Sequence, residues 1–120
     1  MKRRMDLNAI IEALQLKQIG KVKTVKKVSG GYSSDLLSDV MAHAKPGNLL
    51  VTVLVHENVV AVASLLELSA ILITGGKKPA AETVRRAEEQ GVPLLVTDMN
   101  TFEAVGKLYT LLQGVDKWAV

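Results

Sequence analysis

Four stretches of the chain are rich in β-branched and aliphatic residues and predict β-strands. They span residues 21–28, 49–55, 70–74 and 92–98. The sequence LLVTVLV at 49–55 is a continuous apolar run, which is typical of a strand buried on both faces of a parallel sheet. Because parallel neighbours need a crossover connection, we expect a helix between successive strands.

Five helices are predicted, four of them from apolar residues at helical spacing and the one at 59–66 from the crossover that a parallel sheet requires. We expect these helices near residues 6–14, 36–44, 59–66, 79–90 and 102–112. Pro79 is suited to the first position of its helix and Gly91 to the residue after its end. Asn100 and Glu103 have the spacing of a capping box at the start of the last helix.

The alternation of strands and helices predicts an α/β fold, a single domain in which helices flank a mostly parallel sheet. Gly20 is expected to end an N-terminal helical segment, residues 1–20, that packs on the α/β domain of residues 21–120. A chain of 120 residues is long enough to bury one sufficient core without a disulfide or a structural metal.

Composition narrows the possible chemistry. The chain has no cysteine, which excludes thiolate catalysis, thiolate-bound iron–sulfur clusters, cysteine zinc sites and disulfides. It is therefore compatible with a reducing cytoplasm, which is the expected location. No segment approaches the roughly twenty apolar residues of a membrane span, so no membrane association is expected.

The positive charge of the chain is concentrated near its N-terminus. The formal net charge is +3, and residues 1–28 hold eight of the 15 lysines and arginines. Lysines 21, 23, 26 and 27 are interpreted as protection of an exposed edge strand against aggregation. Without aromatic stacking partners or a recognition helix, this cluster is not expected to bind nucleic acid.

Two Gly-Gly segments are candidate anion sites, because each is predicted to lie between a strand and a helix N-terminus. Backbone N–H groups and the helix dipole favour an anion at such a turn. The candidate ligand-binding residues are Gly30, Gly31, Ser33, Ser34, Thr74, Gly75, Gly76 and Lys77. Both turns are predicted at the carboxyl edge of one sheet, where open α/β folds bind ligands. The alternative interpretation is that both turns are only structural, since such bends need glycine in any case.

No catalytic residue, metal site or cofactor is predicted. A phosphate-binding kinase loop is absent, because Lys78 is followed by Pro79 and no hydroxyl follows the lysine. His56 lacks the second histidine of a zinc hydrolase motif. A hydrolytic triad would require Ser33 or Ser34 to converge with His56 and Asp98, and no nucleophile-elbow motif is present.

Three segments together resemble the DRTGG domain family: GGYSSDLLSDVMAHA (30–44), VTVLVHENVVAVASLLELSAILITGG (51–76) and AEEQGVPLLVTDMNTFEAVGKLYTLL (87–112). The eponymous motif survives here as Thr-Gly-Gly at 74–76, without the preceding Asp-Arg. The family occurs as small stand-alone proteins and as modules of phosphotransacetylases and regulated pyrophosphatases. Its fold is similar to the N-terminal, non-catalytic domain of HPr kinase/phosphorylase. The resemblance implies a regulatory or interaction module that pairs across an interface.

These observations lead to a functional hypothesis with open alternatives. The chain is expected to be a non-catalytic regulatory or ligand-sensing module that weakly binds a nucleotide or another phosphorylated metabolite. It is expected to form a homodimer, in keeping with the surplus of apolar residues at 59–66, and to serve a protein partner in a metabolic enzyme system. A minimal enzyme acting on a phosphorylated small molecule and a purely protein–protein interaction domain remain as alternatives.

Overall fold

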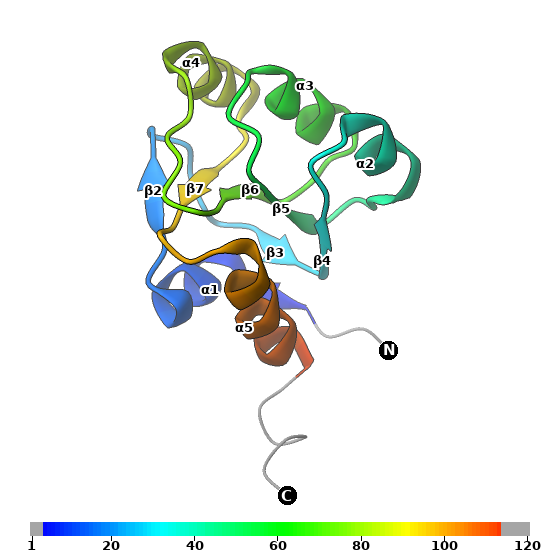
Figure 1. Cartoon of the computed structure of the whole chain (residues 1–120), viewed down its shortest axis with the longest axis vertical. Coiled ribbons are helices and arrows are strands. Elements are labelled where there is room, and N and C mark those ends of the chain that lie inside the picture. The colour runs from blue at the N-terminus through cyan, green and yellow to red at the C-terminus, as the bar shows by residue number, and fades with distance from the viewer. Residues whose placement is uncertain (1–3, 114–120) are drawn as a thin grey trace, which may run out of the picture.

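The computed structural model describes residues 4–113, in which helices cover both faces of a five-stranded sheet (Figure 1). The strands are β1 (Met5–Asp6), β2 (Lys17–Ile19), β3 (Lys27–Val28), β4 (Gly30–Ser33), β5 (Asn48–Thr52), β6 (Ala70–Ile73) and β7 (Leu94–Val96). The helices are α1 (Leu7–Leu14), α2 (Leu37–His43), α3 (Asn58–Leu65), α4 (Ala81–Gln90) and α5 (Thr101–Gln113). Within the described residues no helix is both long and apolar enough to cross a membrane.

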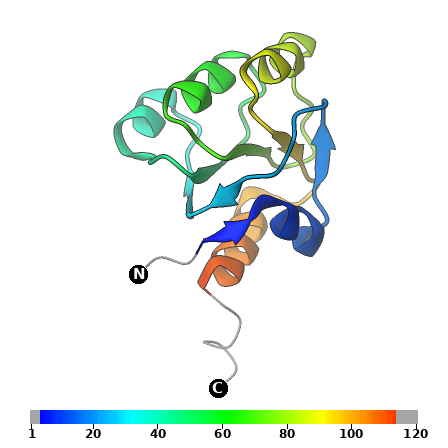
Figure 2. The same cartoon turned by 180° about the vertical axis from the view of Figure 1, so that it is seen from behind.

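The main sheet has the order β2-β7-β6-β5-β4. Strands β4, β5, β6 and β7 are parallel, and β2 pairs antiparallel with β7 at one edge. The predicted α/β fold with a mostly parallel sheet is therefore confirmed. A separate two-stranded ladder joins β1 to β3 beside α1 (Figure 2).

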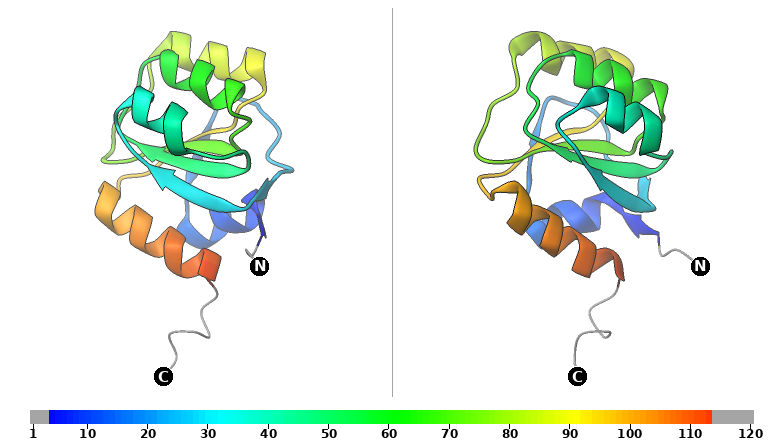
Figure 3. Two further views of the ribbon diagram at one scale, coloured as in Figure 1. Left: turned by 90° about the vertical axis from the view of Figure 1, so that its right-hand side faces the viewer. Right: turned by 45° about the vertical axis from the view of Figure 1, so that its right-hand side comes forward.

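The sheet is sandwiched between two helical layers. Figure 3 shows α2, α3 and α4 on one face and α5 with α1 on the other. All five residues of β5 are buried, as expected for the apolar run in the middle of the sheet. Leu50 packs into the cluster under α2, α3 and α4, whereas Leu49 and Val51 pack against α1 and α5.

The helices largely confirm the expected pattern. Helix α3 lies where the sequence placed it. Val59, Val60 and Val62 are buried in the chain's own core, whereas Leu65 at the end of the helix is 69% exposed. Helix α4 begins at Ala81, two residues later than expected, and ends at a left-handed Gly91. The Asn100 side chain accepts a hydrogen bond from the Glu103 N–H at 2.9 Å, as a cap of α5 should.

The predicted strand at 21–28 is wrong, because only Lys27 and Val28 of that stretch are in a strand. Its alternating lysines cannot be buried on both faces of a parallel sheet. Lys26 instead donates a hydrogen bond to the Gly91 carbonyl at 2.9 Å, and burial lowers the pKa of its ammonium group. Lys27 forms an ion pair with Asp6 at 2.6 Å. Of the four lysines, only Lys27 lies in a strand, and that strand belongs to the ladder with β1 and not to the main sheet.

Helix α1 (Leu7–Leu14) confirms the helix that the sequence predicts near residues 6–14. It ends at Leu14, and Gln15 adopts the left-handed conformation that stops it. The next residues form β2, which extends the main sheet, so the segment before Gly20 is not wholly helical. A three-residue strand has too few positions to show an alternating pattern, which is why the sequence did not reveal it.

Candidate functional site

The turn at Thr74–Gly76 follows β6 at the carboxyl edge of the sheet. Thr74 is fully buried, and its hydroxyl lies 2.7 Å from the Thr101 hydroxyl at the start of α5. Gly75 and Gly76 have φ angles of +74° and +70°, a conformation that favours glycine. The turn thus has the tight geometry that the sequence predicted for it.

The backbone donors of this turn are already used inside the protein. The Gly75 N–H donates to the Met99 carbonyl at 2.7 Å, and the Gly76 N–H donates to the Thr97 carbonyl at 2.9 Å. Both acceptors belong to the loop between β7 and α5. The turn therefore fastens two loops together, and an anion at this position would have to rely on neighbouring side chains instead.

The other Gly-Gly segment is not a turn. Gly30 and Gly31 lie in β4, with Gly30 opposite Asn48 at the beginning of β5. Their expected position at the carboxyl edge is wrong, because they lie at the opposite end of the strands from Thr74. Only the serines that follow reach the carboxyl edge, where the Ser34 N–H donates to the Val51 carbonyl at 3.2 Å.

Close packing of α5 against β4 favours glycine at position 31. A Cβ atom added to Gly31 would lie 3.2 Å from Cδ2 of Leu108 on α5. Beside it, the Tyr32 hydroxyl donates to Asp39 at 2.8 Å, and Asp39 also bonds to His43 at 3.0 Å. The bond from Tyr32 is the main cause that lowers the pKa of the Asp39 carboxyl, and the same bond raises the pKa of Tyr32. This cluster connects β4 to α2.

The remaining candidate residues for catalysis are not brought together by hydrogen bonds. The His56 ring accepts a hydrogen bond from the Asn58 N–H at 3.2 Å, while Asp98 lies beside Gly76. Among residues 4–113, no hydrogen bond links a serine hydroxyl to a histidine ring. In the same part of the chain, no three His, Cys, Asp or Glu side chains gather that could hold a metal ion.

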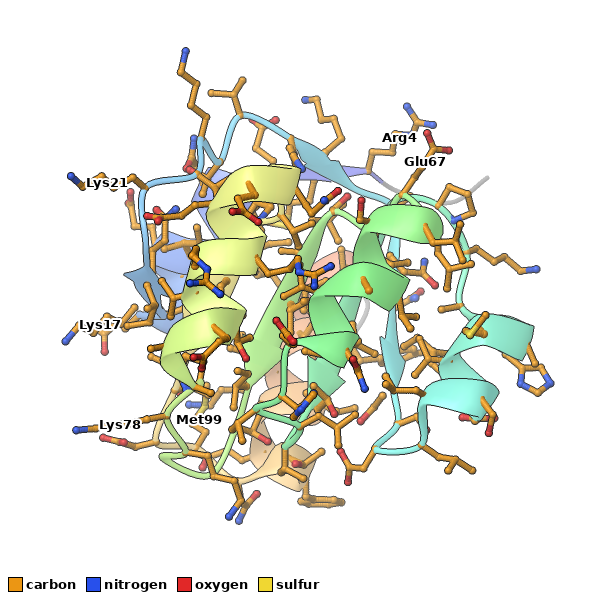
Figure 4. The ribbon with its side chains drawn as sticks, turned by 90° about the horizontal axis from the view of Figure 1, so that it is seen from above. Arg4, Lys17, Lys21, Glu67, Lys78 and Met99 are labelled. Carbon is orange, nitrogen blue, oxygen red and sulfur yellow. The ribbon has the colours of Figure 1, made fainter. Side chains whose placement is uncertain are left out.

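A lysine-lined groove of about 500 Å³ lies beside the Thr74–Gly76 turn, between β2, β7 and the start of α4. The groove is lined by three lysines, one aspartate and several aliphatic residues: Lys17, Ile19, Gly76, Lys77, Lys78, Pro79, Val84, Val96, Thr97 and Asp98. Figure 4 shows Lys17 and Lys78 projecting from the same side of the molecule, with Lys21 further along it. Of the predicted site residues, Gly76 and Lys77 line this groove.

Sequence reasoning missed two parts of the groove for different reasons. Lys17 enters it through β2, the strand that the apolar pattern did not reveal. Asp98 was considered only as a possible member of a triad, but it lies in the loop after β7, with its carboxylate 3.3 Å from where a Cβ on Gly76 would be. The sequence predicted that this strand ends at residue 98, and that ending could have indicated Asp98 as a residue of the carboxyl edge.

Comparisons with known proteins identify the family. The sequence matches the DRTGG domain over residues 8–111. The fold is similar to a crystal structure of the CBS and DRTGG domains of the regulatory region of Clostridium perfringens pyrophosphatase, complexed with the activator diadenosine tetraphosphate. The TM-score is 0.66 at 18% identity, and the match covers 86% of this chain and 45% of that one. No curated protein matches the sequence significantly. This chain belongs to the DRTGG domain family.

Proposed function

We propose that this chain is a non-catalytic regulatory module that senses a nucleotide or another phosphorylated metabolite in the lysine-lined groove. Membership of the DRTGG family supports a regulatory role, as does the similarity to a pyrophosphatase regulatory region that binds a nucleotide activator. The proposal places the ligand beside the predicted Thr74–Gly76 turn. The contacts come from side chains, since the N–H groups of Gly75 and Gly76 are occupied.

The observation that carries this proposal is that three lysines line one groove. Lys17 comes from β2, whereas Lys77 and Lys78 come from the loop before α4. Asp98 is the only carboxylate in the lining, which leaves an excess of two positive charges at the carboxyl edge of the parallel sheet. This arrangement favours a multiply charged phosphate ester over a neutral ligand.

The expected affinity is low and depends on salt. An exposed charge pair contributes about 0.2–1 kcal/mol, so three lysines together contribute about 3 kcal/mol at most, and the Kd should be about a millimolar or weaker even with help from the aliphatic wall. Screening at physiological ionic strength acts over about 8 Å and weakens such contacts further. Binding should therefore be sought at low salt.

The test is a calorimetric titration with ADP, acetyl phosphate and inorganic phosphate at low and at high salt. Lys17→Gln and Lys77→Gln should each weaken binding by about 2- to 5-fold. Lys107→Gln is the matched control, because Lys107 lies on α5, 3.6 Å from Glu103, and does not line the groove. Equal losses in all three variants would show non-specific attraction, and the absence of any binding at low salt would overturn the proposal.

A purely interacting module is the second candidate. It is favoured by the internal use of the Gly75 and Gly76 donors, since a turn that fastens two loops needs no ligand. In that case no phosphate compound should raise the thermal midpoint of the protein, because only a ligand that prefers the native state stabilises it. The third alternative, a minimal enzyme, is favoured by none of the hydrogen bonds between described side chains.

A further inference from the structure

A second groove adjoins the lysine-lined groove along α4. It has a volume of about 630 Å³ and is lined by the loop after β2 and the end of α4, through Lys21, Val22, Lys23, Val25, Lys26 and Glu88. Val84 lines the first groove and Glu88 the second, and these residues are one turn apart on the same side of α4. On the opposite wall, Ile19 lines the first groove and Lys21 the second. The two grooves therefore form one channel along α4, here called the α4 channel.

The α4 channel concentrates the positive charge of the protein. Its lining holds six lysines against two carboxylates, an excess of four charges, whereas the net charge of the whole chain is only +3. Figure 4 shows Lys78, Lys17 and Lys21 in a row along the side of the molecule where α4 lies. Within residues 4–113, five of the six lysines form no ion pair: Lys17, Lys21, Lys23, Lys77 and Lys78. An occupant that complements this channel is therefore negatively charged.

Aliphatic side chains separate two groups of lysines in the channel. Ile19, Val84 and Val96 line the first groove and are only partly buried. Along the wall formed by β2 and the next residues, Lys17 is followed by Ile19 and then by Lys21. The channel thus presents charge, aliphatic surface and charge in that order, and a complementary occupant carries the same order with negative charges.

We propose that the α4 channel docks an extended acidic segment of a partner protein, in which two carboxylates flank an aliphatic side chain. Residues i, i+2 and i+4 of an extended chain share one face, so the segment has the pattern Glu-x-Leu-x-Glu. Its first carboxylate lies near Lys17 and Lys78, and its aliphatic side chain rests on Val84. Its second carboxylate lies near Lys21 and Lys23. Five extended residues span about 16 Å, close to the length of about 15 Å of the ten-residue helix α4.

The lining and the shape of the channel favour such a segment over other anions. Of the described residues, no arginine and no aromatic residue lines it, so it lacks the groups that stack on the bases of single-stranded nucleic acid. A flat lipid surface does not reach partly buried aliphatic residues between two walls. A small phosphate compound fills only the first groove and leaves Lys21 and Lys23 without a partner. Docking of the segment therefore does not require the proposed small ligand, although both would compete for Lys17.

Two isomeric peptides test the pattern. The probe acetyl-Gly-Glu-Ser-Leu-Ser-Glu-Gly-amide has its carboxylates and leucine on one face when extended. The isomer acetyl-Gly-Ser-Glu-Leu-Glu-Ser-Gly-amide has the same composition and charge, but its leucine points away from both carboxylates. In NMR titrations at low salt the probe should bind at least about 3-fold more tightly and shift the amide signals of Lys17 and Lys21. Equal affinities would show general attraction to a basic surface and overturn the proposal, as would tighter binding of an oligothymidylate with two phosphates.

Lysine variants separate this docking from the binding of a small ligand. Lys21→Gln and Lys23→Gln should each weaken the probe by about 2- to 5-fold, whereas Lys107→Gln, outside the channel, is the matched control. Lys21→Gln retains the contact of the loop with α4, because the Lys21 backbone N–H, and not its side chain, donates to Glu88 at 3.0 Å.

ADP titrations of the same variants complete the test. Lys21→Gln and Lys23→Gln should affect ADP far less than the probe, because they lie outside the first groove, whereas Lys17→Gln should weaken both ligands. A probe that binds with this dependence while ADP does not bind supports docking and removes only the proposed small-ligand function. A probe that does not bind, or that binds Lys21→Gln and Lys23→Gln as tightly as the wild type, overturns the docking proposal whatever ADP does.

Discussion

The chain contains the dipeptide Gly-Gly twice, and the two copies have different structures and different tasks. Gly75 and Gly76 form a left-handed turn whose donors bind the loop after β7. Gly30 and Gly31 form part of an extended strand, in which the missing side chain allows α5 to approach. In one dipeptide glycine allows a left-handed backbone conformation, and in the other it allows close packing of a helix.

The neighbouring residues explain this difference. Gly31 is followed by Tyr32, whose ring packs against the core and whose hydroxyl bonds to Asp39, so the chain continues as a strand. Gly76 is followed by two lysines and then Pro79, which cannot continue a buried strand. The comparison teaches that a Gly-Gly dipeptide forms a turn only when the chain after it leaves the sheet.

Replacement of Gly76 by valine should have the largest effect on the stability of the protein. A β-branched residue is strained at a φ of +70°, and its Cβ would lie 3.3 Å from Asp98. We expect the free energy of unfolding to fall by about 2 kcal/mol in urea denaturation. Gly76→Asn should cost less, because asparagine tolerates this conformation. Equal stability of the valine variant and the wild type would contradict the left-handed turn.

Gly31→Ala tests the close packing of β4 against α5. The added methyl group meets Leu108 at 3.2 Å without backbone strain, and we expect a loss of about 1–2 kcal/mol from overpacking. The loss should shrink in a Leu108→Ala background, since the neighbour is then smaller. A double-mutant cycle of urea midpoints measures this coupling. Additive effects of the two substitutions would argue against close contact between β4 and α5.

Thr74→Val tests whether a side-chain hydrogen bond also holds this turn against the start of α5. Valine fills the same volume but removes the hydroxyl that lies 2.7 Å from the Thr101 hydroxyl. We expect a loss of about 1 kcal/mol, because a buried hydrogen bond is removed. Thr101→Val in the same background should add little further. If each substitution costs as much in the presence of the other as alone, the two hydroxyls do not interact.

The smallest expected effect concerns pH and the Tyr32 cluster beside Gly31. The pKa of Asp39 is lowered in the folded protein, so its contribution to stability is present above the usual carboxyl range and is lost as the pH falls below about 4. The pKa of Tyr32 is raised, so its contribution is present below about pH 10 and is lost as the pH rises through that region.

Tyr32→Phe removes the hydrogen bond that is the largest single cause of both pKa shifts. The variant should therefore have a flatter dependence of its melting temperature on pH at both extremes. His43→Gln, which leaves the Tyr32 bond in place, is the matched control and should retain the alkaline dependence. Identical pH profiles of Tyr32→Phe and the wild type would show that the hydroxyl does not bind Asp39 in solution.

The sequence predicted most of the fold because its central strands are fully apolar. The run at 49–55 and the stretch at 70–74 could only be buried, and the helices between them follow from the parallel arrangement. It failed at both edges of the sheet. Edge strands are half exposed, so β2 and β4 show neither a continuous apolar run nor a clear alternation.

The sequence predicted only part of the candidate site, because only some of its residues carry a local signal. The sequence located the Thr74–Gly76 turn and Lys77, because glycines and lysines after a buried strand are a local signal. It could not show that Met99 and Thr97 occupy the turn's donors, since those bonds join loops more than 20 residues apart. Lys17 was missed because only the tertiary fold brings β2 beside the turn.

Amide hydrogen exchange of Gly75 and Gly76, followed by NMR, tests most directly the claim that this turn is fastened internally. Both N–H groups should exchange far more slowly than in an unstructured chain, because they bind the Met99 and Thr97 carbonyls. The protection should be unchanged when ADP or phosphate is added at low salt, while the signals of Lys17 and Lys78 shift. Exchange of both glycines at the unstructured rate, with protection appearing only when phosphate is bound, would contradict this account.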